Sequence, residues 1–343
     1  MKSGIIACVL LLSVTSCKSQ SVDRAGVAFY NVENLMDTID NPLKLDDEFT
    51  PGSEKAWNTE KYLTKLQHIA EVLVTAGQDL PVLIGLCEIE NRKVLEDLIG
   101  RQELQAGNYG IAQFDSPDAR GIDCALLYRK DRFEVKDAFP VQVDLSMEGG
   151  GATRDILYVS GVFKADKSQT LVHVFVNHWP SRYEGEEVTR PRRIKAASVL
   201  KRQIDSLNNK YDDPVIIAMG DFNDSPFDES LMITLSAATH QENFADESLV
   251  NLVAEFQKTN DGSYNYKGNW QALDQMIVSE CLLTGNSRLQ ADKRKVRFIR
   301  NDFQMYNNTK YGPTPNRTYG GSNYYGGYSD HLPVYFEIVL TDL

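Results

Sequence analysis

Short runs of successive apolar residues constrain the fold of this chain more than any other feature of its sequence. The run at residues 215–219, Val-Ile-Ile-Ala-Met, has no polar position, which is typical of a strand buried on both faces of a sheet. Runs of strand length that are mainly β-branched or apolar occupy residues 27–32, 82–87, 109–114, 124–128, 156–163, 171–176, 215–219, 273–278 and 334–339. The chain is therefore expected to contain many short, buried strands.

Two helices are expected among these strands. Asn58 can cap a helix in which apolar residues recur at positions 62, 66, 69 and 73, at spacings of three and four. A second helix with an apolar stripe is predicted to begin near Pro191, because proline is favoured in a first turn. Helices that alternate with doubly buried strands indicate sheets that pack together and are covered by helices.

The composition limits the kinds of partner that the chain can bind. With 343 residues, 42% of them hydrophobic, the chain can bury a large core. A net charge of −12 lacks the basic footprint of proteins that grip nucleic acid without specificity. An enzyme that meets phosphates through a metal ion and a few arginines is still compatible with this charge. No repeat, low-complexity tract or linker divides the chain after about residue 24, so residues 25–343 are expected to form one domain.

The first residues have the pattern of a targeting segment. Lys2 precedes an apolar stretch at residues 5–12 that is too short to cross a bilayer. Residues 14–17, Val-Thr-Ser-Cys, resemble the lipobox of bacterial lipoproteins, which implies cleavage before Cys17 and attachment of lipid to it. Residues 1–16 are thus expected to be a signal peptide and residues 17–24 a tether. The protein would then be lipid-anchored in the cell envelope, at the outer membrane or facing the periplasm. The alternatives are an ordinary signal peptide and a buried first strand.

Three cysteines remain in the expected domain, Cys87, Cys124 and Cys281. They have neither the CxxC nor the Cys/His spacing of a metal site. Cys87 and Cys124 fall within apolar runs, so we expect them to be small buried hydrophobic residues.

Polar side chains gather where the predicted strands end. They include Asn31, Glu88, Asn177, His178, Asp221, Asn223, Asp330 and His331. Hard cations prefer oxygen ligands, and a phosphoryl oxygen is stabilised by positive charge and hydrogen-bond donors, so the pattern predicts a metal and phosphate site. Taken singly, each residue also fits a turn, a cap or a strand end. Asp274 is different, because a charge inside a buried strand is rarely tolerated without a partner.

Seven segments, taken in order, resemble those of the endonuclease/exonuclease/phosphatase superfamily, which is also called deoxyribonuclease I-like. They are residues 29–34 (FYNVEN), 87–88 (CE), 123–128 (DCALLY), 177–178 (NH), 220–223 (GDFN), 273–274 (LD) and 329–334 (SDHLPV). The resemblance spans nearly the whole expected domain. It implies an α+β fold, a four-layer sandwich of two mixed β-sheets packed face to face and flanked by α-helices. The site would lie at one end of the sandwich.

The resemblance also implies how a metal ion and a water molecule are held. Glu88 is expected to be the principal ligand of Mg²⁺ or Mn²⁺, with Asn31 and Asp330 near the metal. Asp221 and Asn223 are expected to orient the nucleophilic water and the scissile phosphate. All five positions carry the oxygen-bearing side chains that such a cation requires.

Two histidines complete the implied catalytic set. Asp274 is expected to fix the tautomer of His331, and Asp123 matches the acidic residue that pairs with His178 in the nuclease branch of the superfamily. An imidazole titrates near neutral pH, and a carboxylate partner raises its pKa and fixes its orientation. The sequence lacks a GxSxG nucleophile motif, which favours in-line attack by water over a covalent intermediate. Asp221 and His331 both remain candidates for the general base.

Further residues are candidates for contact with the substrate. Arg182 follows His178, and arginines at positions 190, 192 and 193 begin the second predicted helix, where phosphate contacts and a solvated basic face are both compatible with the sequence. Residues 303–328 read as a long loop with six tyrosines and five glycines, which leads into Asp330. Tyr324 and Tyr325 are expected to contact substrate, unless the loop packs on itself.

The combined prediction is a divalent-metal-dependent hydrolase of phosphate esters. A nuclease or phosphodiesterase is preferred, because the match of Asp123 and His178 belongs to that branch, and its substrate would be nucleic acid or a small diester. The alternatives are a phospholipid phosphoesterase of the sphingomyelinase kind, an inositol-phosphate phosphoesterase, and a binding module without catalysis. The membrane is expected as a partner only through the lipid anchor, and no protein partner is implied.

Overall fold

The computed structural model of the protein describes residues 23–340, apart from residues 166, 168, 240–248 and 286. The predicted signal peptide, the predicted lipidation site Cys17 and residues 18–22 of the predicted tether lie outside the described residues. Asp23 and Arg24, the last two residues of the predicted tether, already belong to the first strand of the domain. Among the described residues, no helix has the length and apolar character needed to cross a membrane.

The first large sheet has six strands in the order β14-β19-β1-β2-β4-β3. They are β1 (Asp23–Leu35), β2 (Leu83–Ile89), β3 (Tyr109–Gln113), β4 (Asp123–Arg129), β14 (Leu289–Phe298) and β19 (Val334–Leu340). Strands β1 and β2 are parallel, whereas every other neighbouring pair is antiparallel.

The second large sheet has seven strands in the order β5-β6-β7-β8-β13-β10-β9. They are β5 (Phe133–Val141), β6 (Ile156–Phe163), β7 (Leu171–His178), β8 (Val215–Asp221), β9 (Ala237–Ala238), β10 (Leu249–Asn251) and β13 (Asp274–Ser279). The pairs β7–β8 and β9–β10 are parallel, and the others are antiparallel. Both sheets are therefore mixed, as predicted.

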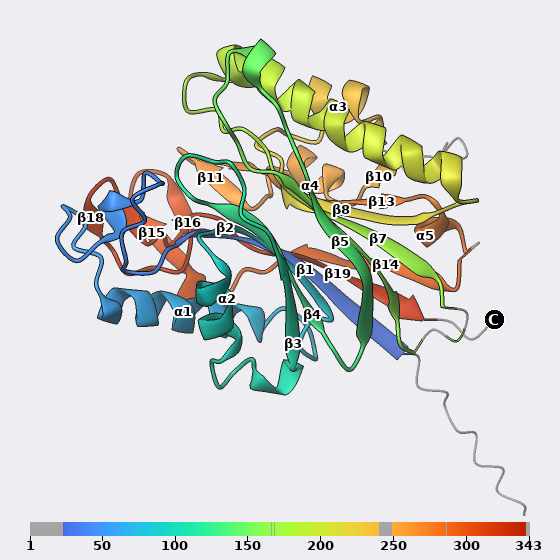
Figure 1. Ribbon diagram of the computed structural model, residues 1–343, viewed down its shortest axis with the longest axis horizontal. Coiled ribbons are helices and arrows are strands. Elements are labelled where there is room, and N and C mark those ends of the chain that lie inside the picture. Colours follow the sequence, from blue (N-terminus) through green and yellow to red (C-terminus); the bar gives the residue numbers. More distant parts are fainter. Residues whose placement is uncertain (1–22, 166, 168, 240–248, 286, 341–343) are drawn as a thin grey trace, which may run out of the picture.

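Helices cover the outer faces of the two sheets. The α-helices are α1 (Thr59–Leu73), α2 (Arg92–Ile99), α3 (Glu186–Lys210), α4 (Ala254–Lys258) and α5 (Cys281–Thr284). Shorter 3-10 or π turns occupy Asp47–Phe49, Gln105–Gly107, Ser146–Glu148, Ser230–Thr234 and Asp302–Gln304. Figure 1 shows α3 along one outer face of the molecule and α1 along the opposite face, with the strands between them.

The central strands of both sheets are buried on both faces, which explains their continuous apolar runs. Phe29 of the first sheet and Val174 of the second lie in the core between the sheets. The next residue along each strand points to the opposite face, so Tyr30 packs toward α1 and α2 and Phe175 packs toward α3. Each large side chain buried in this way contributes roughly 1.5–3 kcal/mol to stability. The predicted four-layer sandwich is confirmed.

The two predicted helices form, one of them with a different start. The side chain of Asn58 caps α1 by accepting a hydrogen bond from the backbone N–H of Lys61 at 3.0 Å. Helix α3 begins at Glu186, five residues before the predicted start at Pro191. Acidic residues are favourable at a helix N-terminus, and Pro191 lies in the second turn, where it removes one hydrogen bond.

Several elements form that the sequence did not indicate. The edge strands β5 and β14 carry exposed charges such as Lys136 and Arg294, which interrupt their apolar pattern and discourage edge-to-edge pairing. The predicted long loop contains two hairpins, β15 (Met305–Asn308) with β16 (Gly312–Pro315) and β17 (Tyr319–Gly320) with β18 (Asn323–Tyr324). A third hairpin joins β11 (Tyr264–Tyr266) to β12 (Asn269–Gln271). Figure 1 shows β11, β15, β16 and β18 gathered at one end of the sandwich.

The cysteines behave as expected. Cys87 and Cys124 face each other in the register of β2 and β4, and both are buried as free thiols, like Cys281. Burial raises the pKa of all three thiols. These residues therefore pack as small hydrophobic side chains.

Candidate active site

The strand register places the chemically important residues beside one another. Asp221 ends β8 and pairs with His178 at the end of β7 and with Asp274 at the start of β13. His331 comes shortly before β19, whose first residue pairs with β1 two positions before Asn31. The ends of β1, β7 and β8 and the starts of β13 and β19 therefore meet at one end of the sandwich.

Asp274 and His331 form a buried pair. The Oδ2 atom of Asp274 lies 2.6 Å from Nδ1 of His331. The other carboxylate oxygen, Oδ1, is buried and has no hydrogen-bond partner among the described residues. Burial alone would lower the pKa of His331, but the negative charges of Asp274 and Asp221 raise it well above its usual value. The pair predicted from the sequence is thus in contact, with a protonated imidazole favoured.

Asp221 lies among Asn31, His178 and His331. Its Oδ2 atom accepts a hydrogen bond from Nδ2 of Asn31 at 3.1 Å, and it lies 3.9 Å from Nε2 of His331 and 3.8 Å from Nε2 of His178. Burial raises the pKa of Asp221 to about 7; the charge on His331 opposes this shift and the charge on Asp274 adds to it. One possible ligand atom from each of Asp221, Asp274 and His331 lies within 4.8 Å of the others, so this buried group could hold a metal ion.

Glu88 lies next to this group on strand β2. Its Oε2 atom accepts a hydrogen bond from the backbone N–H of Asn34 at 2.9 Å, and its Oε1 atom lies 3.9 Å from Nε2 of His178. Glu88 has a positive φ of 61°, as do Asn34 (55°) and Asn223 (51°). Left-handed backbone at residues other than glycine is strained, and such strain is concentrated at functional sites.

Asn31 differs from the expected metal ligand in one respect. Its amide nitrogen, and not its oxygen, faces Glu88 at 3.4 Å and Asp221 at 3.1 Å. The amide oxygen instead accepts a hydrogen bond from the backbone N–H of Glu33 at 3.0 Å. In this arrangement Asn31 orients two carboxylates, and its oxygen would reach a cation only after rotation of the amide.

Asp330 lies at the mouth of the site. It is half-buried and contacts a terminal nitrogen of Arg317 at 2.5 Å. The buried Glu33 accepts hydrogen bonds from the backbone N–H groups of Thr318 at 2.7 Å and Tyr319 at 3.2 Å. Burial, together with the charge on Asp330, raises the pKa of Glu33 to about 7. Sequence reasoning missed Glu33 and Arg317 as site residues, although Glu33 lies in the FYNVEN segment.

Some of these residues, Glu33, Glu88, Asp330 and His331, line a cleft of ≈ 480 Å³. We call it the acidic cleft, because its lining includes the carboxylates of Glu33, Glu48, Glu54, Glu88 and Asp330. Lys55 and Arg317 are the basic residues of its described lining. A concentration of buried carboxylates and an unpartnered buried oxygen on Asp274 fit a hard divalent cation, which binds oxygen ligands and neutralises such charges.

The predicted pair of Asp123 and His178 does not form. Asp123 accepts hydrogen bonds from the backbone N–H of Ser116 at 2.7 Å and from Nε2 of Gln113 at 2.8 Å. Nδ1 of His178 is buried without a hydrogen-bond partner among the described residues. Burial, assisted by the positive charge of Arg154, lowers the pKa of His178 well below its usual value. His178 is therefore neutral at the site. The carboxylate of Asp123 accepts its hydrogen bonds from the segment just before it.

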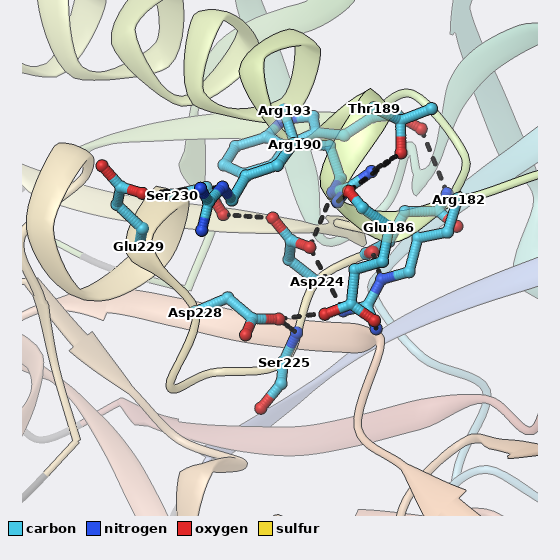
Figure 2. A network of polar contacts seen from close by, with 12 residues as sticks. Arg182, Glu186, Thr189, Arg190, Arg193, Asp224, Ser225, Asp228, Glu229 and Ser230 are labelled. Carbon is cyan, nitrogen blue, oxygen red and sulfur yellow. Dashed lines mark hydrogen bonds and ion pairs between the residues drawn. The ribbon is translucent and has the colours of Figure 1, made fainter. Parts of the chain in front are cut away.

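Arg182 is also placed differently from the prediction. Its Nε atom donates to the backbone oxygen of Asn223 at 2.5 Å, and a terminal nitrogen contacts Asp224 at 3.1 Å and Asp228 at 2.8 Å. Figure 2 shows Arg182 and Arg193 converging on Asp224. The guanidinium of Arg182 thus holds the segment that carries Asn223.

The other candidate arginines pair with nearby acids. Arg193 is fully buried and contacts Asp224 at 2.6 Å. Arg192 contacts Glu184 at 2.7 Å, and Arg190 lies 3.3 Å from Glu187. Contacts with acids of α3, of the loop before it and of the loop after β8 therefore account for these positive charges.

Tyr324 and Tyr325 line a second cleft, of ≈ 850 Å³, beside the acidic one. We call it the tyrosine cleft, after its residues Tyr264, Tyr266, Tyr306, Tyr311, Tyr324 and Tyr325. Arg317 and Asp330 line both clefts, so the two cavities meet next to His331. His331, Asp274 and Asp221 together are called the reactive cluster. Two of the three hairpins that build the tyrosine cleft, β15–β16 and β17–β18, lie within residues 303–328, which were predicted as a loop.

Several proteins of known structure share this fold. TDP2 from Caenorhabditis elegans, in truncated form, has a TM-score of 0.53 at 14% identity, over 92% of this chain and 97% of that chain. The human nocturnin catalytic domain with bound sulfate anion has a TM-score of 0.54 at 15% identity, over 93% and 95%. A mannosyl-6-phosphatase from Bacteroides thetaiotaomicron has a TM-score of 0.56 at 17% identity, over 92% and 99%. Identities this low establish a shared fold.

Sequence comparison identifies the family. A search of curated protein sequences gives no match. The sequence profile of the Endonuclease/Exonuclease/phosphatase family, in contrast, matches residues 26–340, which include all the strand ends described above. The chain therefore belongs to the endonuclease/exonuclease/phosphatase family of phosphoester hydrolases.

Proposed function

We propose that the protein hydrolyses a phosphodiester by in-line attack of water, with Mg²⁺ or Mn²⁺ bound in the acidic cleft. The observation that carries this proposal is the buried contact of Asp274 with His331 beside Asp221 and Glu88. Glu88 and Asp330 would hold the cation, joined by Asn31 if its amide rotates. When bound, the cation would supply positive charge to the phosphate and lower the pKa of a bound water.

The residues of the chain would divide the proton chemistry between them. Asp221, with a pKa raised to about 7, supports a role as the base that accepts the proton of the attacking water. His331, kept protonated by Asp274 and Asp221, would donate a hydrogen bond to a phosphate oxygen on which charge accumulates. The neutral His178 would present its Nε2 atom to the same phosphate. Of the two candidate bases, the structure favours Asp221.

The choice of a diester is supported by the two clefts that meet at Arg317 and Asp330. A phosphate held between them could place one ester group in each cleft, whereas a monoester would occupy only one. Asp123 and His178 do not pair, so their match to the nuclease branch no longer supports a diester substrate. The two clefts that meet at Arg317 and Asp330 support it independently.

Phospholipids are a poorer fit to the tyrosine cleft. Among its described lining residues, Pro315 is the sole aliphatic one, and the others are tyrosines, amides, a hydroxyl side chain and charged groups. An acyl chain would gain little from such a surface. A ring or a polar group is better matched to it.

A substrate panel tests the proposed reaction. Bis-p-nitrophenyl phosphate, p-nitrophenyl phosphate, an oligonucleotide, plasmid DNA, sphingomyelin and inositol phosphates would each be incubated with the protein and Mg²⁺ or Mn²⁺. We expect diesters to be hydrolysed faster than the matched monoester. A protein that cleaves only monoesters would contradict the assignment as a phosphodiesterase. A protein that cleaves only sphingomyelin would contradict the assignment of a substrate without acyl chains.

We also propose that lipid on Cys17 anchors the protein in the cell envelope. Strand β1 begins at Asp23, and Asn31 lies toward its other end, so an anchor before Asp23 would leave the acidic cleft accessible. Metabolic labelling with a palmitate analogue should mark the protein, and Cys17→Ala should abolish the label. Retention of the label by Cys17→Ala would refute the anchor.

A further inference from the structure

The tyrosine cleft has no role in the hydrolysis of the phosphate itself, yet it adjoins the groups that would perform it. We propose that this cleft binds one unstacked nucleoside of the substrate, next to the phosphate that is cleaved. The inference rests on the proposed phosphodiester hydrolysis and specifies its substrate class. The substrate would be single-stranded nucleic acid or a nucleotide diester.

Several aromatic rings of the cleft are exposed to solvent, Tyr306 and Tyr325 most of all. They come from three hairpins, β11–β12, β15–β16 and β17–β18, with Tyr311 in the turn between β15 and β16 and Tyr325 directly after β18. Tyr266 is 52% exposed, Tyr306 is 56% exposed and Tyr325 is 60% exposed, although each lines a concave surface. A nucleobase gains stability by stacking on such rings, whatever its sequence identity.

Tyr264 connects the cleft to the reactive cluster. Its ring centroid lies 4.9 Å from that of His331, with an angle of 36° between the two ring planes. The backbones of the two residues are also joined by an isolated β-bridge. A nucleoside bound in the tyrosine cleft would therefore have its phosphate close to His331, Arg317 and Asp330.

The charges around the two clefts favour a nucleotide over a neutral ring. Lys267 lies over the ring of Tyr266 at 4.8 Å from its centroid, and Lys310 lies over Tyr311 at 4.9 Å. These cations at the rim could follow the next phosphate of a strand. The acidic cleft would repel that phosphate, so the strand is expected to extend on the tyrosine side.

A hydrogen-bond donor of the cleft also lacks a partner. Asn265 accepts a hydrogen bond from the backbone N–H of Gly268 at 2.9 Å through its Oδ1 atom. Its Nδ2 group is buried without a partner among the described residues, and Asn265 lines the cleft. A carbonyl or ring nitrogen of a base would satisfy this donor. Bases in a duplex are already stacked and paired, so only an unpaired base could enter.

Two substrates that differ only in the nucleoside provide the test. Thymidine 5′-(p-nitrophenyl phosphate) and methyl p-nitrophenyl phosphate have the same leaving group, and their hydrolysis would be followed with Mn²⁺. In Tyr306→Ala and Tyr325→Ala, KM for the thymidine ester should rise roughly 5- to 100-fold, which is the usual effect of losing one stacking ring. The methyl ester should be hydrolysed as before.

Matched variants separate stacking from other effects. Tyr306→Phe and Tyr325→Phe should retain the low KM, because the ring remains. Tyr211→Ala, which changes a tyrosine at the opposite end of the second sheet from Asp221, should leave the preference for thymidine unchanged. Equal KM values for the two esters in the unmodified protein, or equal losses on both esters in the alanine variants, would overturn the inference.

The failure of this inference can be distinguished from failure of the proposed function. If methyl p-nitrophenyl phosphate is not hydrolysed with any divalent metal, the proposed hydrolysis fails. Calorimetric titration of thymidine 5′-monophosphate into the unmodified protein and into Tyr306→Ala would then test the cleft alone. Binding that is weakened by the substitution supports the cleft, and absent or unchanged binding refutes it. A phenylalanine variant as impaired as the alanine variant would also overturn the inference, because the cleft would then depend on the tyrosine hydroxyl and not on stacking.

Discussion

Individual side chains at the strand ends determine where the protons lie. His178 and His331 both place Nε2 within 4 Å of Asp221, at 3.8 and 3.9 Å. Burial lowers the pKa of His178, whereas the carboxylates of Asp274 and Asp221 raise that of His331 against the effect of burial. One imidazole is thus neutral and the other charged at neutral pH. The sequence indicates two histidines of similar kind, and only the contacts distinguish them.

The contact between Asp274 and His331 leads to a kinetic prediction. Asp274→Asn removes the charge that orients and protonates the imidazole, so kcat should fall roughly 10²–10⁴-fold, much as in His331→Ala. The double variant should lose little more than either single variant, because the two residues act as one unit. The measurement is kcat for bis-p-nitrophenyl phosphate in all three variants. Losses that multiply independently in the double variant would show that the residues act separately.

Arg182 is predicted to act as a positioning residue. It holds the carboxylate of Asp224 (Figure 2) and also the backbone oxygen of Asn223. Arg182→Ala should therefore let the Asn223 segment shift. We expect kcat to fall roughly 10- to 100-fold, as small misplacements of catalytic groups do, with KM changed little. Arg190→Ala is the control, because Arg190 is exposed and pairs with Glu187. A large rise in KM with kcat unchanged would instead indicate contact with substrate.

At the scale of elements, the buried strands were the predictable part of the fold. All nine apolar runs form strands, because burial on both faces requires an unbroken apolar pattern. The edge strands β5 and β14 were not predicted, because their exposed charged residues interrupt the apolar pattern. Each of them has a neighbouring strand on one edge only. The hairpins in residues 303–328 escaped because two- to four-residue strands leave no periodic signal.

The sequence predicts which residues belong to the site better than it predicts which of them are in contact. The register of β7, β8 and β13 brings together His178, Asp221 and Asp274, and strand ends are visible in a sequence. Asp123 is different, because it starts β4 in the other sheet and its carboxylate turns to its own loop. Contacts between sheets and the direction of a loop side chain depend on packing, which apolar patterns do not encode.

Strand β7 also carries a histidine outside the site that should make stability depend on pH. His173 is buried, and its Nδ1 lies 2.7 Å from the hydroxyl of Tyr158. Burial lowers the pKa of His173 to about 4, below its unfolded value near 6.5. As pH falls, His173 is therefore protonated in the unfolded chain before it is protonated in the folded protein. Its contribution to stability is present above about pH 6.5 and is lost as pH falls toward 4.

Comparison with a non-titrating variant isolates this effect. Unfolding free energies of the unmodified protein and His173→Gln would be measured by urea denaturation between pH 7.5 and pH 4.5. The advantage of the unmodified protein should shrink by ~2 kcal/mol across this range. The difference removes the opposite contribution of acids with raised pKa values, such as Asp221. A constant gap between the two proteins would contradict the assignment of a lowered pKa to His173.

At the scale of the whole molecule, the sandwich collects acidic groups at one end. Burial raises the pKa of both Asp221 and Glu33 to about 7, which reflects the cost of keeping carboxylates charged there. A divalent cation would neutralise these charges and stabilise the folded protein. The net charge of −12 is therefore compatible with a phosphate-processing enzyme that uses a metal ion in place of a basic surface.

The most direct test of the central claim is to add metal back to the metal-free protein. The rate of bis-p-nitrophenyl phosphate hydrolysis would be measured after EDTA treatment while Mg²⁺ or Mn²⁺ is titrated, for the unmodified protein and for Glu88→Gln. We predict no turnover in EDTA, recovery that saturates with added metal, and a rate at least roughly 100-fold lower in Glu88→Gln. Full turnover of the unmodified protein in EDTA, or full recovery of Glu88→Gln at the same metal concentration, would contradict the claim.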